Sequence, residues 1–379
     1  MNKTIKIIIA IIVIVLVVWG ISSLSGNKKP VETGPIKIGA ITPLSGDAAQ
    51  LGEFFKSVDD LALAEINAAG GINGRQIQVV YEDDRCNGKD ALTAFQKLLT
   101  VDQVKIVLVS TCSSGVLSVL PAADQNKIFI LSGAATSPAI TGKSQMFIRT
   151  VPSDASQGRV LAEAAIAHGW KKVGIIQESS DYAVALADAF ISNYPSTAGQ
   201  VIREQYPDTT KDFKPLLTKV KGEKPDALFL IPQSPGTAGR LVKQFGDLSW
   251  EVPLLVDDVI SGNPETVNNN IKTLEGALAA EQGIDLTDSK YQVLEKNYTE
   301  KYGKEMAYKS YGEAEYDLIN LLAQGLKEKG EDSLALATWA HSIKDWPGVS
   351  GLVTIDANGD RVGGHVLKII KDGKSEVVK

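Results

Sequence analysis

Short apolar runs alternate with longer amphipathic stretches from residue 36 onward, a pattern typical of strands separated by helices. The first series predicts strands over 36–41, 77–81, 106–109 and 128–131, and helices over 50–67, 90–101 and from 114. The second series predicts strands over 173–177, 201–205, 227–231 and 253–256, and helices over 182–194, 213–221 and 236–245. Strands joined by helices form parallel sheets with right-handed crossovers. We therefore expect an α/β protein of two doubly wound, parallel-sheet lobes.

The last part of the chain has a different pattern. Helical spacing dominates residues 287–344. Two apolar segments, Leu352–Ile355 and His365–Ile370, then flank the turn residues Asn358 and Gly359. Apolar segments on either side of an Asn-Gly pair predict antiparallel strands joined by a turn.

The N-terminal residues have the pattern of a targeting segment. Lys3 and Lys6 precede the unbroken apolar run from Ile7 to Trp19, as in an export signal. Within the N-terminal segment 1–21, the stretch from Ile5 to Ile21 gives about 17 residues, the lower limit for a spanning helix. It lacks a small-residue cleavage site, so an uncleaved membrane anchor is favoured over a cleaved signal. The rest of the chain would then lie outside the cytoplasm, joined by a polar tether over 22–35.

Composition limits the classes of function. The 379 residues are 44% hydrophobic and 22% charged, with a net charge of −6, which suits a soluble protein of two domains. An acidic chain lacks the basic face that nucleic acid requires. The three histidines lie far apart in sequence, so neither a zinc site nor a histidine-based triad is expected. No cofactor is indicated.

The two cysteines mark one edge of the first lobe. Cys86 and Cys112 each follow a predicted strand, at the edge of a parallel sheet where ligands bind. An even cysteine count behind an export signal predicts a disulfide, and two buried thiols are the alternative.

Two segments near these cysteines have the chemistry of a binding site. Ser113 and Ser114 open a helix, whose free N–H groups favour an anion such as a carboxylate, although a simple N-cap is the alternative. The small residues of 131–138 let a ligand approach the backbone, and Thr136 adds a hydroxyl. An ordinary turn would explain this second segment equally well.

The order and spacing of several motifs resemble the periplasmic-type substrate-binding proteins of the branched-chain amino acid (Leu/Ile/Val) family. The resemblance covers nearly everything from about residue 36 to 370. The matching stretches are Ile36-Lys37-Ile38-Gly39, Pro43-Leu44-Ser45-Gly46, Asn67-Ala68-Ala69-Gly70-Gly71-Ile72, Asp83-Asp84-Arg85-Cys86, Cys112-Ser113-Ser114 and Gly133-Ala134-Ala135-Thr136-Ser137-Pro138.

This resemblance implies a type I periplasmic binding clamshell with three crossovers between the lobes. They are expected near Pro152, Glu281 and Gly348. The first lobe would then comprise 36–152 plus 281–347, and the second lobe 153–280 plus 348–379.

The resemblance also implies the roles of individual residues. Ser113 would bind the carboxylate of an amino acid. The carbonyl of Ala134 and the hydroxyl of Thr136 would bind its ammonium group. Asp258 would pair with the ammonium from the second lobe. Tyr182 would close over the ligand, and Leu51 would line the pocket for its side chain.

The chain departs from the family pattern at two of these positions. The second-lobe acid is usually a glutamate, but here the stretch Val256-Asp257-Asp258-Val259 offers two aspartates. Either could be the partner, or Asp258 could only cap a helix. Gln233 stands where the family has a tyrosine, which puts a purely aliphatic ligand side chain in doubt. Tyr182 could equally be an aromatic residue on the lobe surface.

We therefore expect an extracytoplasmic binding protein, a monomer without catalytic residues, that captures an amino acid or similar zwitterion for an ABC importer permease. A ligand sensor is one alternative, but the chain shows no output domain. Carriers of urea, amides or aromatic acids share the fold, and Asp258 favours an ammonium-bearing ligand over these. An α/β enzyme is disfavoured by the scarcity of histidine.

Overall fold

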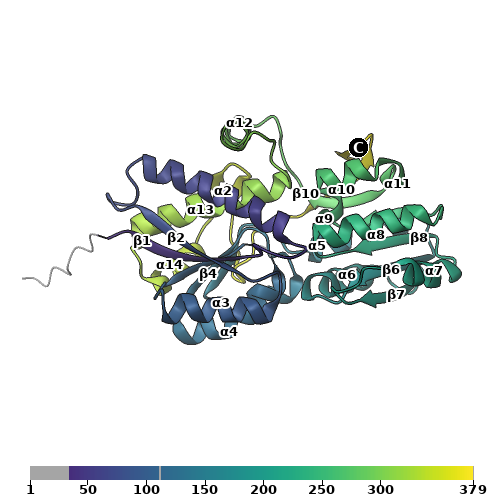
Figure 1. The fold of residues 1–379 in the computed structure, drawn as a ribbon, viewed down its shortest axis with the longest axis horizontal. Coiled ribbons are helices and arrows are strands. Elements are labelled where there is room, and N and C mark those ends of the chain that lie inside the picture. The colour runs from purple at the N-terminus through teal and green to yellow at the C-terminus, as the bar shows by residue number, and fades with distance from the viewer. Residues whose placement is uncertain (1–33, 111, 379) are drawn as a thin grey trace, which may run out of the picture. The chain divides into compact units, whose positions relative to one another are not determined.

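The computed structural model describes residues 34–110 and 112–378, and Figure 1 shows its elements. Ile36–Lys379 form one compact unit. The predicted anchor over 1–21 and nearly all of the tether over 22–35 lie outside the described residues, so both stay predictions. Within the described part, no helix has the length and apolar character needed to span a membrane.

The first sheet is parallel throughout, with strand order β2-β1-β3-β4-β5. Its strands are β1 (Ile36–Thr42), β2 (Ile77–Asp83), β3 (Ile106–Val109), β4 (Phe129–Ser132) and β5 (Phe147–Arg149). One face carries α3 (Gly88–Thr100) and α4 (Ser113–Asn126), and the other carries α2 (Ala49–Ala68), α13 (Lys309–Lys329) and α14 (Ser333–Ala340) (Figure 1).

The side-chain alternation of the strands explains these two layers. In β3, Ile106 and Leu108 pack with α13, whereas Val107 and Val109 pack with α3 and α4. A strand that is apolar on both faces must be covered on both, which is why it reads as an unbroken apolar run.

The second sheet has seven strands in the order β14-β13-β10-β9-β8-β6-β7. Its parallel strands are β6 (Lys172–Glu178), β7 (Gln200–Tyr206), β8 (Ala227–Ile231), β9 (Leu254–Val256) and β10 (Leu278–Gln282). One face is covered by α5 (Ala155–Ala167) and α6 (Asp181–Asn193), and the other by α7 (Lys214–Gly222) and α8 (Pro235–Asp247). The predicted fold class of two doubly wound lobes is confirmed.

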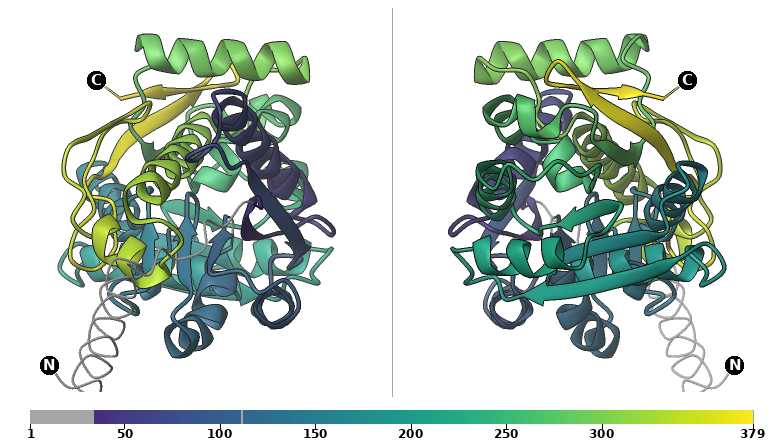
Figure 2. Two further views of the ribbon diagram at one scale, coloured as in Figure 1. Left: turned by 90° about the vertical axis from the view of Figure 1, so that its left-hand side faces the viewer. Right: turned by 90° about the vertical axis from the view of Figure 1, so that its right-hand side faces the viewer.

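Short elements complete both lobes. The helices α9 (Asp258–Ser261), α10 (Pro264–Asn269) and α11 (Ile271–Leu274) follow β9, and the 3-10 turn η1 (Pro138–Ile140) follows β4. The helix α12 (Ser289–Tyr302) lies against α2 through Tyr298 and Phe54, whose rings are 6.3 Å apart. Figure 2 shows α12 and the C-terminal strands from two further sides.

The C-terminal strands pair differently from the sequence prediction. The turn after Ile355 forms, but only the single bridge between Ile355 and Arg361 joins its two sides. The strand β12 (Gly351–Val353) pairs with β11 (Trp346–Gly348), whereas β13 (His365–Lys371) runs antiparallel to both β10 and β14 (Lys374–Val377). The apolar pattern marked the segments correctly but did not specify their partners.

Three segments link the two sheets, as the fold class requires. They are residues 150–154, 283–288 and 356–364. The third lies later than the Gly348 predicted from sequence, because Val353 and Ile355 pack in the core of the first lobe. The lobe bounds near 152 and 281 stay predictions about where the chain hinges.

The predicted disulfide between Cys86 and Cys112 is present and joins the turns after β2 and β3. Arg85 and Cys86 both have left-handed backbone angles, with φ of 48° and 63°. The carboxylates of Asp83 and Asp84 accept hydrogen bonds from these two N–H groups, each at 2.9 Å. The crosslink therefore fixes a strained turn that would otherwise be costly to hold.

We expect loss of the disulfide to destabilise the protein without altering its fold. The crosslink closes a loop with a sequence separation of 26, for which the chain-entropy model gives about 3–4 kcal/mol. The double substitution Cys86→Ala with Cys112→Ala should lower the free energy of unfolding by about this amount, measured by urea denaturation. A reductant should destabilise the wild type and leave the variant unaffected. An equal response of both proteins would contradict the assignment.

Candidate ligand-binding site

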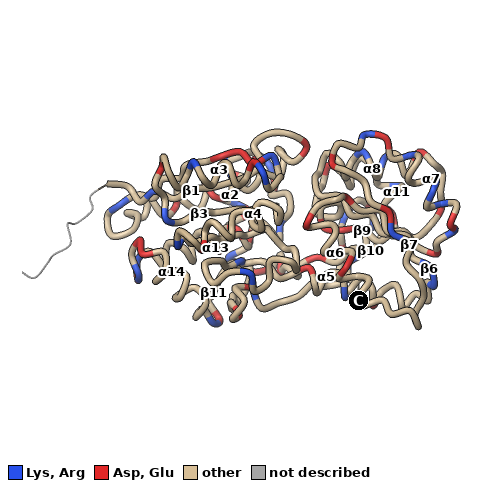
Figure 3. Tube along the Cα trace, turned by 90° about the horizontal axis from the view of Figure 1, so that it is seen from below, with Lys and Arg blue, Asp and Glu red and all other residues tan. Residues whose placement is uncertain are grey.

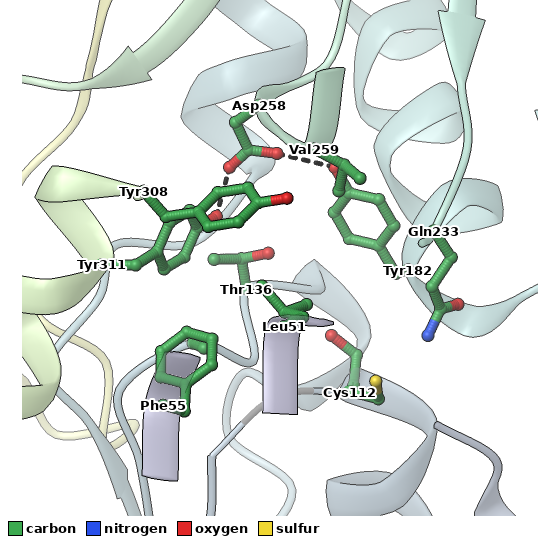
Figure 4. A pocket seen from close by; sticks show the side chains of 12 residues that line it. Leu51, Phe55, Cys112, Thr136, Tyr182, Gln233, Asp258, Val259, Tyr308 and Tyr311 are labelled. Carbon is green, nitrogen blue, oxygen red and sulfur yellow. Dashed lines mark hydrogen bonds between the residues drawn. The ribbon is translucent and has the colours of Figure 1, made fainter. Parts of the chain in front are cut away.

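One pocket lies between residues of the two lobes. Figure 4 shows its lining of twelve side chains. All seven residues proposed from the sequence are among them, namely Leu51, Ser113, Ala134, Thr136, Tyr182, Gln233 and Asp258. Most of these follow the carboxyl ends of β3, β4, β6, β8 or β9, since parallel strands bring those ends to one edge of each sheet.

The first-lobe wall combines a helix N-terminus with a tight turn. Ser113 is the first residue of α4 and is buried, and its Oγ accepts a hydrogen bond from the N–H of Ser137 at 3.2 Å. The hydroxyl proton of Ser113 is therefore free to be donated elsewhere. The first turn of a helix also presents N–H groups and a positive dipole end, so this wall is suited to an anion.

The turn after β4 presents Ala134 and Thr136. Its close packing needs Gly133, because a Cβ there would lie 2.0 Å from Oε2 of Glu315. The hydroxyl of Thr136 donates to Asp154 at 2.5 Å, which leaves its oxygen lone pairs available as acceptors.

The two neighbouring aspartates of the second lobe make different contacts. Asp257 is the N-cap of α9 and accepts a hydrogen bond from the N–H of Ile260 at 3.1 Å. Asp258 lines the pocket instead, so the capping role falls to its neighbour. The hydroxyl of Tyr182 donates to Asp258 at 2.8 Å, and the hydroxyl of Tyr311 donates to its other oxygen (Figure 4).

Few positive charges lie near the acidic side chains of this pocket to stabilise their ionised forms. Burial, followed by the nearby charge of Asp258, raises the pKa of both Asp154 and Asp257 well above its ordinary value. Burial likewise raises the pKa of Asp258. His365 lies 3.7 Å from Asp154, but burial lowers its pKa to about 3 and so keeps it neutral. Figure 3 shows acidic residues near the labels of α5, α6 and β9.

None of the twelve lining residues carries a positive charge. The nearby cations are already paired, Arg149 with Asp360 and Lys368 with Glu281, both at 2.7 Å. A ligand that suits this pocket therefore has a cationic group to place beside Asp258 and an anionic group to place at the start of α4. Among the described residues, no cluster of three or more acidic, histidine or cysteine side chains could hold a metal ion.

Sequence reasoning missed several residues of the lining. Phe55 lies one helical turn after Leu51 on the same face of α2, a spacing that could have identified it. Tyr308 and Tyr311 lie at the start of α13, far from the motifs along the chain, where no local signal marked them.

A set of contacts outside the pocket holds the two lobes together. The carboxylate of Asp47, before α2, binds Arg240 at 2.6 Å and Lys211 at 2.9 Å in the second lobe. These hydrogen bonds, with that of Arg240 the largest effect, lower the pKa of Asp47. Gln50 adds hydrogen bonds to Glu265 and Asn263, at 3.0 and 3.2 Å. The structure therefore shows the pocket with its lobes in contact.

A buried carboxyl pair supports the first-lobe wall from behind. Asp59 on α2 and Glu315 on α13 are both fully buried and lie close enough for the charge of Glu315 to raise the pKa of Asp59. Glu315 also accepts a hydrogen bond from Ser110 at 2.8 Å. Burial raises the pKa of Glu315 to about 7, and burial together with the charge of Glu315 raises the pKa of Asp59. The pair therefore retains a proton at mildly acidic pH.

Two α/β lobes around a pocket lined by a buried carboxylate define a ligand-binding protein. The sequence profile of the periplasmic binding protein family matches residues 35–370, and the chain belongs to this family. It is 27% identical to the Leu/Ile/Val-binding protein BraC3 of Rhizobium johnstonii over 340 residues, which cover 87% of this chain and 90% of that one. It is 30% identical to the Leu/Ile/Val-binding protein of Escherichia coli K12 over 215 residues, covering 55% and 57%.

Solved structures agree on the fold. The substrate-binding protein LivJ of Streptococcus pneumoniae, in complex with isoleucine, is 26% identical, with a TM-score of 0.79 and coverage of 91% of this chain and 99% of that one. A solute-binding protein from R. palustris, in complex with benzoate, has a TM-score of 0.82 at 20% identity, covering 91% and 96%.

We expect the Asp47 contacts to favour ligand binding although Asp47 does not line the pocket. The substitution Asp47→Asn removes a carboxylate that two cations share. Exposed ion pairs of this kind are worth up to about 1 kcal/mol each, so the affinity of the protein for its ligand should fall roughly two- to fivefold. Calorimetry at low and high salt checks this, since salt should weaken wild-type binding more than variant binding. The matched control is Asp247→Asn, which removes a pair to Lys243 within the second lobe. An equal loss in both variants would refute the effect.

The Asp59–Glu315 pair predicts a pH dependence of stability. The pKa of Glu315 in the folded protein is about 7, above its ordinary value of 4.5. The folded state therefore binds the extra proton, and the resulting stabilisation is complete below about pH 4.5 and lost as the pH rises through about 7.

The free energy of unfolding should accordingly fall between pH 6 and 8 more steeply in the wild type than in Glu315→Gln. Urea denaturation across this range measures both slopes. Glu178, whose pKa burial raises to about 7, titrates in both proteins, so only the difference between the slopes reports on Glu315. Identical slopes would contradict the raised pKa of Glu315.

Proposed function

We propose that this chain is an extracytoplasmic solute-binding protein that captures an amino acid between its lobes and delivers it to an ABC importer permease. The observation that carries this proposal is the arrangement of opposite charges across the pocket. The helix N-terminus at Ser113 suits a carboxylate, and the uncompensated Asp258 suits an ammonium group. The relatives named as Leu/Ile/Val-binding proteins support the same class of ligand.

Each predicted residue would have a defined task. The ligand carboxylate would accept hydrogen bonds from the hydroxyl of Ser113 and from N–H groups at the start of α4. Its ammonium group would donate to the carbonyl of Ala134 and the hydroxyl oxygen of Thr136, and would pair with Asp258. Such charge-assisted hydrogen bonds are the strong kind in a site that excludes water.

The remaining residues would enclose the ligand. Tyr182 and Tyr311 already donate to Asp258, so they hold its carboxylate in place for the incoming ammonium. Leu51 and Phe55 lie on the side of the pocket opposite Asp258 in Figure 4, where they would contact the ligand side chain.

Binding would also drive closure of the lobes. Ser113 and Thr136 belong to the first lobe, whereas Asp258 and Tyr182 belong to the second. A ligand can contact both sets only when the lobes approach, so its affinity is higher for the closed state and shifts the population toward it. The closed form would be the one that the permease accepts.

The N-terminal segment would determine where the protein is located. We infer that residues 1–21 anchor it at the outer face of the cytoplasmic membrane, or release it if the segment is cleaved. An anchored monomer would reach a permease on the tether over 22–35, and a released monomer would reach it by diffusion.

The proposal predicts that Asp258→Asn weakens amino acid binding by about 30-fold or more, since a charged hydrogen-bonded pair is worth about 2 kcal/mol or more. A thermal-shift screen of the twenty amino acids first identifies the ligand, and calorimetry then compares the variants. Ser113→Ala should weaken binding as well. The matched control is Glu300→Gln, at a carboxylate that is 66% exposed on α12.

Two results would overturn the proposal. One is that no standard amino acid stabilises the protein. The other is that the Asp258 and Ser113 variants bind as tightly as the control. Stabilisation by benzoate or another acid without an amino group would instead favour a carrier of aromatic acids.

A further inference from the structure

Two carboxyl groups share one hydroxyl at the second-lobe wall of the pocket. The hydroxyl oxygen of Tyr182 lies 2.8 Å from Oδ1 of Asp258 and 3.2 Å from Oδ2 of Asp257. A hydroxyl has a single proton, so it can donate to only one of the two carboxyl groups. The shorter contact, to Asp258, receives this proton (Figure 4). Asp257 is then left facing the lone pairs of the same oxygen atom.

This second contact is favourable only if the carboxyl group of Asp257 carries a proton. An ionised carboxylate is solely an acceptor and would repel the lone pairs of the hydroxyl, whereas a protonated one donates to them. Asp257 is completely buried, and its other oxygen accepts a hydrogen bond from the N–H of Ile260 at 3.1 Å. Burial and the charge of Asp258 also raise the pKa of Asp257 well above its ordinary value. Geometry and pKa thus both indicate that Asp257 is protonated in this arrangement.

The surrounding side chains do not neutralise the two aspartates. The titratable groups that interact with them come from several elements and are Asp154, Tyr182, Tyr206, Glu281, Tyr308 and Tyr311. None of these is a cation. Lys368 is paired with Glu281, and His365 beside Asp154 is neutral because burial lowers its pKa to about 3. A proton and a ligand ammonium group would therefore compete to neutralise the same two carboxylates.

We propose that binding of an amino acid releases the proton of Asp257 to solvent, so that the affinity of the protein for its ligand rises with pH. Before binding, Asp257 donates to Tyr182 and Tyr182 donates to Asp258. The ligand ammonium then donates to Asp258, which frees the hydroxyl of Tyr182 to turn and donate to the ionised Asp257. Each carboxylate keeps a donor, and one proton leaves. This inference rests on the proposed function, because it requires an ammonium group beside Asp258.

The direction of the pH effect follows from linkage. A proton that must leave before the ligand binds opposes binding, so binding weakens as the pH falls below the raised pKa of Asp257. Release of one full proton corresponds to about a tenfold change in affinity per pH unit. The ammonium and carboxylate groups of an amino acid both stay ionised between about pH 5 and 6.5. A change of affinity in this range therefore comes from groups of the protein.

Calorimetry in buffers of different ionisation enthalpy counts the protons that are released. The probe is whichever of the twenty amino acids stabilises the wild-type protein most in a thermal-shift screen. The measured binding enthalpy should change linearly with the ionisation enthalpy of the buffer, with the sign of proton release. The affinity should rise about three- to tenfold from about pH 5.5 to 6.5. A binding enthalpy that is the same in every buffer would overturn the inference.

The substitution Asp257→Asn assigns the proton to this residue. Asparagine keeps the acceptor for the N–H of Ile260 and places a permanent donor against Tyr182, so it imitates the protonated acid without a proton to lose. The dependence on buffer should disappear, and the affinity should vary by less than about twofold over the same pH range. Proton release that persists in this variant would overturn the role of Asp257.

The matched control is Glu315→Gln. It makes the same chemical change at a buried carboxyl group whose pKa is also raised, to about 7, but which does not line the pocket or contact Asp258. This variant should keep both the dependence on buffer and the rise of affinity with pH. Loss of both effects in Glu315→Gln as well as in Asp257→Asn would contradict a specific role for Asp257.

The outcomes separate this inference from the proposed function on which it rests. Amino acid binding without proton release refutes only the inference. Failure of every amino acid to bind refutes both. If Asp257→Asn does not fold, the buffer dependence of the wild-type protein remains the deciding measurement.

Discussion

The structure depends on a carboxylate that is buried in a pocket without a cation. Asp258 is 4% exposed, and its two oxygens accept hydrogen bonds from the hydroxyls of Tyr182 and Tyr311. Hydroxyl donors reduce the desolvation cost of a carboxylate but do not neutralise its charge. Burial raises the pKa of Asp258, and the charge of Asp258 adds to the effect of burial in raising the pKa of Asp154 and Asp257. A positively charged group on a ligand would remove this penalty, so the same feature that destabilises the empty site favours its occupation.

Tyr308 shows how this site is coupled to the position of the lobes. Its ring packs with Phe54 of the first lobe at 5.8 Å and lines the pocket. Its N–H donates to Gly262 at 3.2 Å, and its hydroxyl accepts a hydrogen bond from Asn263 at 2.7 Å, both in the second lobe. The residue adopts a left-handed backbone with φ of 45°, a conformation that tertiary contacts must hold. Contacts from both lobes meet at this one residue, so separation of the lobes would release both its hydrogen bonds and its strain.

The local pattern of apolar residues and the parallel order of the strands explain which parts of the binding site could be predicted from the sequence. Ser113, Thr136 and Asp258 follow strands whose apolar runs are easy to recognise, and parallel strands necessarily bring their carboxyl ends together. Tyr308 and Tyr311 reach the pocket only through the long return of the chain into the first lobe, which no local signal encodes. The pairing of β13 with β10 is equally non-local, and the packing of Val353 in the first core moved the last crossing beyond Gly348. Sequence pattern thus predicted the elements and the edge of the sheet, while long-range packing decided the rest of the site.

The most direct test of this account compares one bound amino acid with its des-amino analogue, the same carboxylic acid without the ammonium group. The analogue keeps every contact at the helix N-terminus and leaves Asp258 unpaired. Calorimetry on the wild-type protein should show that the analogue binds about 100-fold more weakly or not at all, since it forfeits a charge-assisted pair in a buried site. Equal affinity for the two compounds would contradict the claim that Asp258 selects the ligand by its charge.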